Sequence, residues 1–183
     1  MCFVKKTVVI YKSSYGSTKK YAEWIAQELK CDLFDTNKVK DDMLVDYDII
    51  IFGGGLYASG INGISLVKNS FSFLRDKDVI VFTVGLADPE KSDFTSLIDK
   101  NFTSEMKERV KVFHLRGGMD YHKLSFVHRT MMAMLKSMIS RKPEKDLSED
   151  DKGILQTYGQ SVDFTKKENI FPIVDYVMTA QNG

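Results

Sequence analysis

One pattern recurs along the chain: a short apolar run rich in β-branched residues is followed by a longer segment whose apolar residues have helical spacing. Several of the runs are continuously apolar, such as DIIIF and DVIVFTV, which is typical of strands covered on both faces. Strands that alternate with helices form a parallel sheet with right-handed crossovers, so the pattern predicts an α/β layered domain. The predicted strands are residues 7–11, 31–35, 48–52, 78–84 and 111–115.

The segments between and after these runs supply the predicted helices. A polar stretch, RKPEKDLSEDDKG, interrupts the last part of the chain, and Ser148 followed three residues later by Asp151 predicts a helix cap there. A chain of 183 residues is long enough for one sizeable core and too short for two full domains. Helical patterns lie at residues 17–30, 64–74, 94–110, 121–140, 154–159 and 169–179.

Bulk properties exclude several classes of protein. The net charge of +1 gives no global attraction to nucleic acid, and no apolar run is long enough to span a bilayer. Cys2 and Cys31 form neither a CxxC pair nor a metal spacing, and two free thiols suit a reducing cytosol. We therefore expect a cytoplasmic protein in which both cysteines act as small hydrophobic residues.

The first strand leads into a loop of small hydroxyl residues, within VVIYKSSYGSTKKYAEWIA. A helix that begins just after a parallel strand directs its unpaired N–H groups and the positive end of its dipole into the crevice at that edge. Gly16 allows close backbone approach, and the neighbouring hydroxyls suit a phosphate monoester bound by neutral donors. The alternative is that these residues only turn the chain and cap the helix. The loop residues are Ser13, Ser14, Gly16, Ser17 and Thr18.

The other predicted strands also run into glycine or small polar residues. The third continues into GGGLY, the fourth into TVGLAD and the fifth into RGGMD. Because the carboxyl ends of parallel strands share one edge of the sheet, these segments meet where open α/β sheets bind ligands. Three glycines in a row indicate a tight approach of the main chain to something flat or close.

The segments YKSSYGSTKKYAEWIA, YDIIIFGGGLYASG and DVIVFTVGL resemble the first, third and fourth strands of flavodoxin-like FMN proteins. The segment LRGGMDYHKLSFVHRTMMAMLKSMISRKPE resembles the long insertion of the flavodoxin-like, menaquinone-dependent protoporphyrinogen oxidases. The resemblance implies one flavodoxin-like domain over residues 1–183 with an extension at about 119–147. It also implies an open, twisted, five-stranded parallel sheet of order 2-1-3-4-5 with helices on both faces.

The resemblance implies non-covalent FMN and a set of contact residues. Tyr15 replaces a threonine of the usual phosphate loop, so one hydroxyl is lost there. Tyr57 is placed to stack on the flavin, and the loop after the fourth strand holds no second aromatic, which leaves one flavin face open to a substrate. The implied cofactor-binding residues are Ser13, Ser14, Tyr15, Gly16, Ser17, Thr18, Gly53, Gly54, Gly55, Leu56, Tyr57, Thr83, Val84, Gly85, Leu86, Gly117, Gly118 and Asp120.

An open flavin face and near-neutral charge favour an enzyme over a simple carrier. We expect an FMN-dependent oxidoreductase that moves electrons between a flat, porphyrinogen-like substrate and a quinone or protein acceptor. The alternatives are a flavodoxin-type electron carrier and, third, a domain that has lost its flavin. His114 lies within a strand and is expected to be structural, while His122 and His128 are too scattered for a metal site. Asp88 and Asp120 suit proton transfer, but solvated loop carboxylates are the more common case.

Residues 123–139 form an amphipathic, Met-rich segment with basic residues around it. It has three interpretations, which we rank in this order. It covers the sheet or the flavin pocket; it is an adaptable docking surface for a partner; or it lies in a membrane surface and gives access to quinone, so that residues 121–142 make peripheral contact. The basic residues are Lys123, Arg129, Lys136, Arg141 and Lys142.

Overall fold

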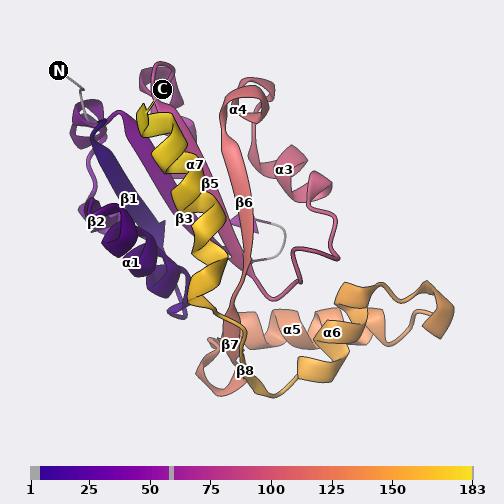
Figure 1. The fold of residues 1–183 in the computed structure, drawn as a ribbon. Helices are drawn as coiled ribbons and strands as arrows, with labels where there is room; N and C mark the ends of the chain where they lie inside the picture. The colour runs from indigo at the N-terminus through magenta and orange to yellow at the C-terminus, as the bar shows by residue number, and fades with distance from the viewer. Residues whose placement is uncertain (1–4, 58–59, 183) are drawn as a thin grey trace.

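The computed structural model describes residues 5–57 and 60–182. Its centre is a parallel sheet, and the strand order β2-β1-β3-β5-β6 confirms the predicted order 2-1-3-4-5 (Figure 1). The predicted flavodoxin-like α/β fold is therefore confirmed. The parallel strands are β1 (Thr7–Lys12), β2 (Asp32–Asp35), β3 (Ile49–Tyr57), β5 (Asp78–Gly85) and β6 (Lys111–Arg116).

Three short strands were not predicted. β4 (Gly60–Ile61) pairs antiparallel with the end of β3, and β7 (Gly118–Asp120) forms a separate two-stranded sheet with β8 (Ser161–Asp163). The predicted end of the third strand was also wrong, because β3 continues five residues past Phe52 through the glycines to Tyr57. Pairing with β1 and β5 keeps these glycines extended despite their low strand propensity.

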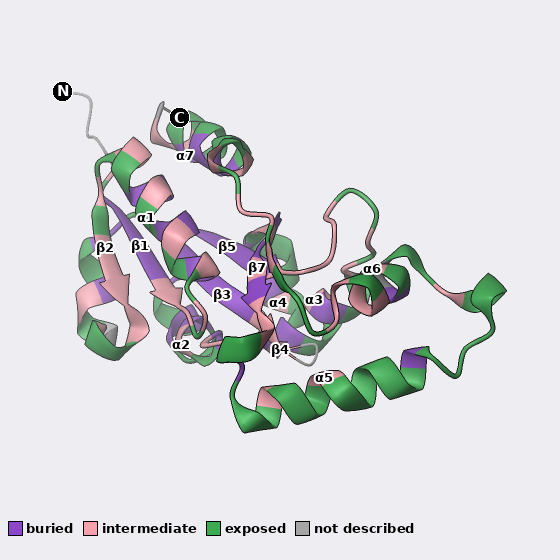
Figure 2. Ribbon diagram, turned by 90° about the horizontal axis from the view of Figure 1, so that it is seen from below, coloured by how far each residue is buried: buried purple, intermediate pink, exposed green. Residues whose placement is uncertain are grey.

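Helices cover both faces of the sheet, and successive side chains along each central strand point alternately into the two hydrophobic cores. On one face, α1 (Ser17–Leu29) and α7 (Phe171–Asn182, after the 3₁₀ turn η6, Lys167–Ile170) pack on side chains such as Val9 and Ile51. In Figure 1 both helices lie in front of the sheet, and Figure 2 colours most of β1, β3 and β5 as buried.

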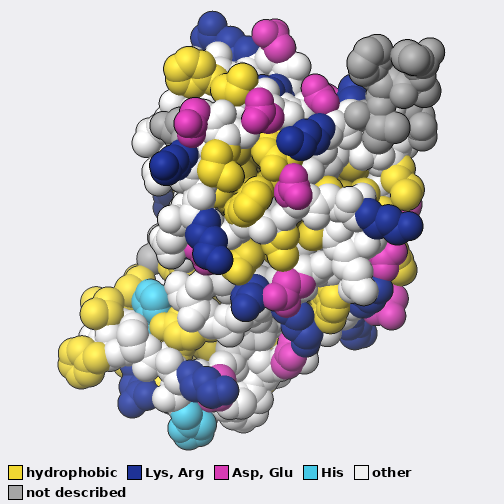
Figure 3. Space-filling view, turned by 90° about the vertical axis from the view of Figure 1, so that its left-hand side faces the viewer, with side chains coloured by type: hydrophobic (Ala, Val, Ile, Leu, Met, Phe, Trp, Pro, Cys, Tyr) yellow, Lys and Arg dark blue, Asp and Glu magenta, His cyan; other side chains and the backbone are white. Residues whose placement is uncertain are grey.

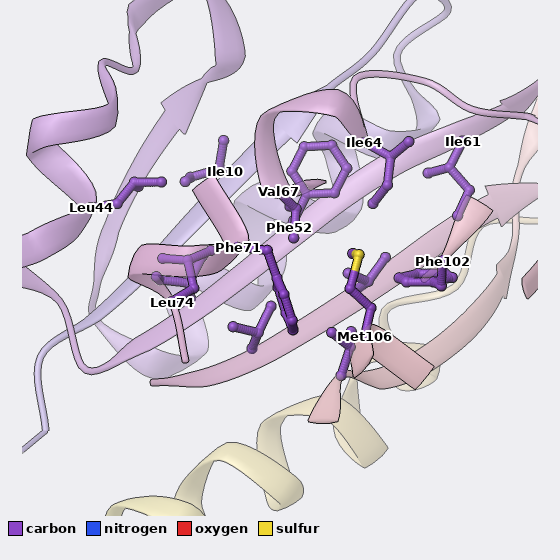
Figure 4. Close-up of a cluster of buried hydrophobic side chains, with 14 of the residues drawn as sticks. Ile10, Leu44, Phe52, Ile61, Ile64, Val67, Phe71, Leu74, Phe102 and Met106 are labelled. Carbon is purple, nitrogen blue, oxygen red and sulfur yellow. The ribbon is translucent and has the colours of Figure 1, made fainter. Parts of the chain in front are cut away.

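The opposite face is covered by shorter elements. Figure 4 shows their apolar side chains converging on Ile10 and Phe52 of the sheet. The helix predicted at 94–110 is two helices, because Phe102 and Thr103 are extended and Thr103 caps the second one. The elements on this face include η1 (Thr36–Lys38), η2 (Asp41–Asp46), α2 (Ser65–Ser70), η3 (Phe71–Phe73), α3 (Thr95–Asn101) and α4 (Ser104–Arg109).

Between β7 and β8 the chain leaves the layered body. It forms η4 (Tyr121–Lys123), α5 (Phe126–Ile139), η5 (Glu144–Asp146) and α6 (Glu149–Thr157), beyond the carboxyl edge of the sheet (Figure 1). The predicted cap is confirmed, because Ser148 and Asp151 form a reciprocal capping box on α6. This excursion runs from Gly118 to Asp163, whereas the extension was predicted at about 119–147, because the pairing of β7 with β8 defines both of its ends.

Two sequence expectations concern the whole chain. Cys31 is partly buried, and burial raises the pKa of its thiol to about 11, so it behaves as a small apolar side chain. Cys2 lies outside the described residues. Within residues 5–57 and 60–182, no helix is both long enough and apolar enough to cross a bilayer.

Candidate functional site

The β1–α1 loop presents an open helix N-terminus at the carboxyl edge of the sheet. Gly16 precedes α1 with a φ of 98°, a backbone conformation that residues other than glycine rarely adopt. Among the described residues, no side chain caps the N-terminus of this helix. By contrast, the α5 N-terminus is capped by Ser125, whose Oγ accepts from the His128 N–H. The first N–H groups of α1 therefore keep their capacity to bind an anion.

The predicted hydroxyl residues of this loop connect it to neighbouring elements. Ser17 Oγ accepts from the Gly118 N–H at 3.0 Å, and Ser14 Oγ accepts from Asn62 Nδ2 at 3.2 Å. Ser13 Oγ accepts from the Gly16 N–H at 3.0 Å. A hydroxyl that accepts a bond keeps its own hydrogen, so Ser13 still has a donor for a ligand. These bonds hold the loop in one shape before any ligand arrives.

The close approach predicted for the glycines at the end of β3 is confirmed at two of the three positions, where the close neighbours belong to the protein itself. A Cβ on Gly53 would lie 2.1 Å from the Phe82 ring, and one on Gly54 would lie 2.6 Å from Ile61 Cγ2. Packing inside the protein, rather than approach of a ligand, requires glycine there. Their part in cofactor binding stays a prediction.

Gly55 has a more direct link to the candidate site. A Cβ at this position would lie 3.0 Å from the ring of Tyr57, so glycine leaves space for that ring. Gly85 does the same for Leu56, whose Cδ1 would lie 3.0 Å from an added Cβ. These two glycines shape the segment that was predicted to contact the flavin ring.

Thr83 is buried and its hydroxyl is already bonded, so its predicted part in cofactor binding stays a prediction for its backbone alone. It has no exposed surface, and its hydroxyl shares a 2.6 Å hydrogen bond with His114 Nδ1. His114 in turn stacks on Phe94, with ring centroids 3.7 Å apart. Burial lowers the pKa of His114 to about 4, so the ring is neutral and structural, as predicted.

The ends of β5 and β6 are joined by one hydrogen bond between backbone groups and one from a side chain to the backbone. Gly85 O accepts from the Gly117 N–H at 2.7 Å, and Leu86 O accepts from Arg116 Nε at 3.1 Å. Val84 is buried in the core on the α1 side, where a Cβ on Gly117 would lie 2.6 Å from its Cγ1. These residues therefore form the rigid edge beside the loops.

Asp120 lies at the edge of a cavity of about 260 Å³ between the β1–α1 loop and β7–β8. Its carboxylate accepts from the His122 N–H at 3.1 Å and from Ser161 Oγ at 2.8 Å, and it lies 3.3 Å from Lys123 Nζ. These contacts, led by the Ser161 hydroxyl, lower the pKa of Asp120. A carboxylate fixed in this way stabilises the turn, which fits the structural alternative better than proton transfer.

A larger cavity of about 340 Å³ lies on the other side of the β1 end, between Lys12, Asn37 and α2. It contains none of the predicted cofactor-binding residues. We place the candidate site at the loops instead, because an uncapped helix N-terminus and aromatic rings meet there.

Sequence reasoning missed the role of His128. Its ring stacks on Tyr57 with centroids 4.9 Å apart and an interplanar angle of 3°, and its Nδ1 lies 2.5 Å from the Tyr15 hydroxyl. Tyr15 also accepts the Ser125 N–H at 3.2 Å. The phosphate loop, the end of β3 and α5 thus meet in one cluster of three rings, and burial raises the pKa of Tyr57 within it.

The preferred interpretation of the Met-rich segment, a helix that covers the sheet or the flavin pocket, was wrong for the sheet, and a cover for the flavin pocket stays a prediction. α5 does not cover the sheet: most of its length is exposed, and Ile139 is its buried residue (Figure 2). Its large exposed apolar residues are Phe126, Val127, Met131, Met134, Leu135 and Met138.

Comparisons with known proteins agree with the fold. The family model described as "Flavodoxin domain" matches residues 8–146. The uncharacterized protein MJ0298 of Methanocaldococcus jannaschii is 42% identical over 53 residues, which are 28% of this chain and 35% of that protein. The match thus spans about a third of the relative's length.

Similar solved structures are flavoproteins by name. A WrbA-like flavodoxin from Agrobacterium tumefaciens is 27% identical, with 47% of this chain and 63% of that chain covered and a TM-score of 0.41. A flavodoxin from the domain Archaea is 16% identical, with 94% and 99% covered and a TM-score of 0.47. A flavoprotein in complex with FMN from Lactobacillus acidophilus is 18% identical, with 61% and 92% covered and a TM-score of 0.41. None of these matches supports the protoporphyrinogen oxidase subgroup.

Proposed function

Because this chain belongs to the Flavodoxin domain family, we propose that it is a flavoprotein that binds FMN non-covalently at the carboxyl edge of its sheet. One observation carries the proposal: α1 begins at Gly16 without a side-chain cap, at the point where the strand order reverses between β1 and β3. The helix dipole and the free N–H groups there favour a phosphate dianion.

The residues around that N-terminus fit a terminal phosphate. The first turn of α1 contains no acidic residue, so nothing there repels an anion. Ser13 offers a hydroxyl hydrogen, and Gly16 leaves the main chain uncovered, since no atom lies within 4 Å of where its Cβ would be. The loop also lacks the GxGxxG spacing of dinucleotide-binding folds, which favours FMN over FAD or a nicotinamide.

Tyr57 supplies the position for the flavin ring. Its face already accepts a flat conjugated ring, because His128 stacks on it almost in parallel. We infer that the flavin ring takes this face in place of His128, with Gly55 leaving room for Tyr57 and Leu56 packing toward Gly85. Tyr15 then remains the side chain that links the phosphate loop to Tyr57 and α5.

The bound flavin would supply electron transfer, while the chain binds it, orients it and limits access to it. We favour an oxidoreductase that takes electrons from a flat reduced substrate of the porphyrinogen type and passes them to a quinone or protein. The exposed apolar side of α5 lies next to the ring cluster and gives such a substrate an apolar wall. The second candidate is an electron carrier of the flavodoxin type.

Calorimetric titration of the purified apoprotein with FMN and with FAD tests the cofactor. We expect saturable FMN binding with a flavin absorption spectrum, and weaker FAD binding. Absence of FMN binding, or preference for FAD, contradicts the proposal. To separate enzyme from carrier, the loaded protein is reduced without oxygen and offered protoporphyrinogen and quinones. Saturable turnover identifies an enzyme, whereas electron exchange without saturation identifies a carrier.

A further inference from the structure

The cavity of about 340 Å³ beside the end of β1 lies outside the candidate cofactor site. Its lining comes from the last residue of β1, from η1 and from the segment that leads into α2. Its volume falls at the lower end of the range for sites that bind small molecules, about 300–1,000 Å³. The polar residues that line it are Lys12, Thr36, Asn37, Ser65 and Asn69.

Lys12 brings a cation to this cavity without a carboxylate partner. Among the side chains that the structure describes, no carboxylate oxygen lies within 4.0 Å of its Nζ, which donates to the neutral Asn37 Oδ1 at 2.8 Å. On the side of the molecule that carries β2 and α1, Figure 3 shows cations and carboxylates interspersed. Lys12 therefore differs from lysines such as Lys5, which lies 3.0 Å from Asp78. An ammonium has three N–H donors, so two of them stay available at Lys12.

Packing holds the Lys12 side chain in place. Lys12 is paired with Gly54 of β3, which fixes its main chain at the edge of the sheet. Gly63 has a φ of 77°, and a Cβ there would lie 2.8 Å from Lys12 Cβ. Glycine at this position thus leaves room for the lysine stem beside the segment that leads into α2.

Thr36 adds a hydroxyl that has no partner. Within the described part of the chain, its Oγ1 is the buried side-chain nitrogen or oxygen atom that forms no hydrogen bond. Buried polar groups are nearly always hydrogen-bonded, because an unpaired one destabilises the fold. A ligand in the cavity that Thr36 lines could supply the missing partner.

The lining is rich in donors and contains no carboxylate. The amides of Asn37 and Asn69 have two N–H groups each, and the hydroxyls of Ser65 and Thr36 have one O–H each. With the two N–H groups of Lys12 this makes about eight donors. A carboxylate has about four acceptor positions, whereas a phosphate monoester has three terminal oxygens and up to two negative charges. The donor set therefore suits a phosphate better than a carboxylate.

We propose that this cavity binds the phosphate group of a small organic phosphate, at a site separate from the N-terminus of α1. Lys12 pairs with the phosphate charge, and Asn37 and Ser65 donate to its oxygens. Thr36 turns its hydroxyl toward the ligand by one change between staggered rotamers. Leu66 gives the organic part of the ligand an apolar contact. The proposal does not depend on flavin binding.

Amide NMR titration of the isotope-labelled full chain with inorganic phosphate tests the proposal, and malonate serves as the carboxylate probe. We expect saturable shifts at the backbone amides of Asn37, Ser65 and Leu66 and at the side-chain amide of Asn37. Malonate should bind more weakly, because it has fewer acceptor positions at each charged group.

Lys12→Met keeps the stem beside Gly63 and removes the charge, so it should raise the Kd for phosphate by about ten-fold or more. Lys68→Met is the matched control. Lys68 is exposed on α2 and does not line the cavity, so its loss should change the Kd by less than about two-fold. Circular dichroism verifies that both variants fold.

Thr36→Val removes the unpartnered hydroxyl and keeps the shape of the side chain. It should raise the melting midpoint of the phosphate-free protein by about 2–4 °C and weaken phosphate binding. Stability and affinity thus change in opposite directions, which a purely structural threonine would not show.

Several results overturn the proposal. They are the absence of saturable shifts, shifts confined to residues 16–18 at the N-terminus of α1, and tighter binding of malonate than of phosphate. An equal loss of affinity in Lys68→Met and Lys12→Met overturns it as well, because long-range attraction would then explain the binding. So does unchanged phosphate affinity in Thr36→Val.

Discussion

α1 and α5 are two amphipathic helices of nearly equal length, 13 and 14 residues, but α1 buries its apolar side and α5 exposes it. α1 buries Tyr21 and Ile25 completely in the core that it shares with the sheet and α7. α5 leaves its apolar side in solvent, contacts Tyr57 through His128 and packs against α6. The two N-termini are opposite as well: that of α1 is open, and that of α5 is capped by its own Ser125.

The difference separates structural from functional amphipathicity. In α1 the apolar side stabilises the fold, and the uncapped end is kept available for a ligand. In α5 the side chain of Ser125 caps the N-terminus, and the apolar side is exposed and available for binding. A helix can therefore bind a ligand or partner through its N-terminus or through its side. The part that is buried stabilises the fold, and the part that stays exposed is available for binding.

The largest expected effect comes from truncating the buried side of α1. Ile25→Ala removes a fully buried side chain and should lower the free energy of unfolding by about 2–5 kcal/mol. The matched change in α5, Met134→Ala, removes an exposed side chain and should change it by less than about 0.5 kcal/mol. Urea unfolding, followed by circular dichroism, measures both values. Similar losses in the two variants would contradict the contrast between the helices.

The next effect concerns the open end of α1. Thr18 lies in the first turn of α1 and is buried, with 4% of its surface exposed. We expect Thr18→Val, which removes its hydroxyl, to weaken FMN binding by about 1.5–3 kcal/mol. Gly16→Val should weaken it further, because a β-branched residue at a φ of 98° strains the loop by about 1–3 kcal/mol.

Ser125→Ala at the α5 N-terminus is the control for this pair. It removes a cap worth about 1 kcal/mol of helix stability and should leave FMN affinity unchanged. Calorimetry measures the three affinities. If Gly16→Val and Thr18→Val bind FMN like the parent, the phosphate does not bind at α1.

The buried region should also respond to acid through His114. Its pKa in the folded protein is about 4, whereas the ordinary value is 6.5. Between these pH values the unfolded chain binds a proton that the folded chain does not, so the free energy of unfolding falls as the pH is lowered from 6.5 to 4. We expect about 1–2 kcal/mol from this residue, less than full conversion of the shift, because the ring is partly exposed.

His114→Gln isolates this contribution. Urea unfolding at pH 4 and pH 7 should show a smaller difference between the two pH values in the variant than in the parent, by about 1–2 kcal/mol. Carboxylates contribute equally to both proteins and cancel in the comparison. An identical pH dependence in parent and variant would mean that His114 has the same pKa in the folded and unfolded states.

The parts of this structure that follow from local pattern were predictable. The alternation of strands with helices and the capping box on α6 depend on periodicity and on residues close in sequence. The order of the strands in the sheet was predicted from the resemblance to flavodoxin-like proteins. The length of β3 was not predictable in the same way. Glycines have little intrinsic preference for strands, and here Phe82 and Ile61 from other elements fill the space above Gly53 and Gly54.

The candidate site was only partly predictable for a related reason. Motifs around Gly16 and Tyr57 are continuous in sequence and could be recognised. The contact between Tyr15 and His128 joins residues 113 positions apart, and no local pattern contains it. Periodicity likewise predicted an apolar side for α5 but held no information about which surface that side would face. A helix covering the sheet or the flavin pocket was predicted, and in the structure α5 does not cover the sheet and most of it is exposed.

The smallest expected effect concerns the contact that joins the two regions. His128 is the α5 side chain that reaches the candidate cofactor site, through its stack on Tyr57 and its 2.5 Å bond to Tyr15. His128→Ala should leave the free energy of global unfolding nearly unchanged, because the core does not include this ring. Amide hydrogen exchange in α5 should become faster, since local opening of the helix no longer breaks these contacts.

FMN affinity decides how the ring cluster works. If the flavin ring takes the Tyr57 face that His128 occupies, binding must first break that stack, and stacked pairs of rings are worth about 0.5–1.5 kcal/mol. His128→Ala should then bind FMN more tightly by that amount, about two- to ten-fold, in calorimetric titration. Tyr57→Ala is the matched change on the other ring and should weaken binding, because it removes the surface on which the flavin stacks. Weaker FMN binding by His128→Ala would mean that the histidine packs against the bound flavin instead, and that α5 is a wall of the site rather than a helix displaced from it.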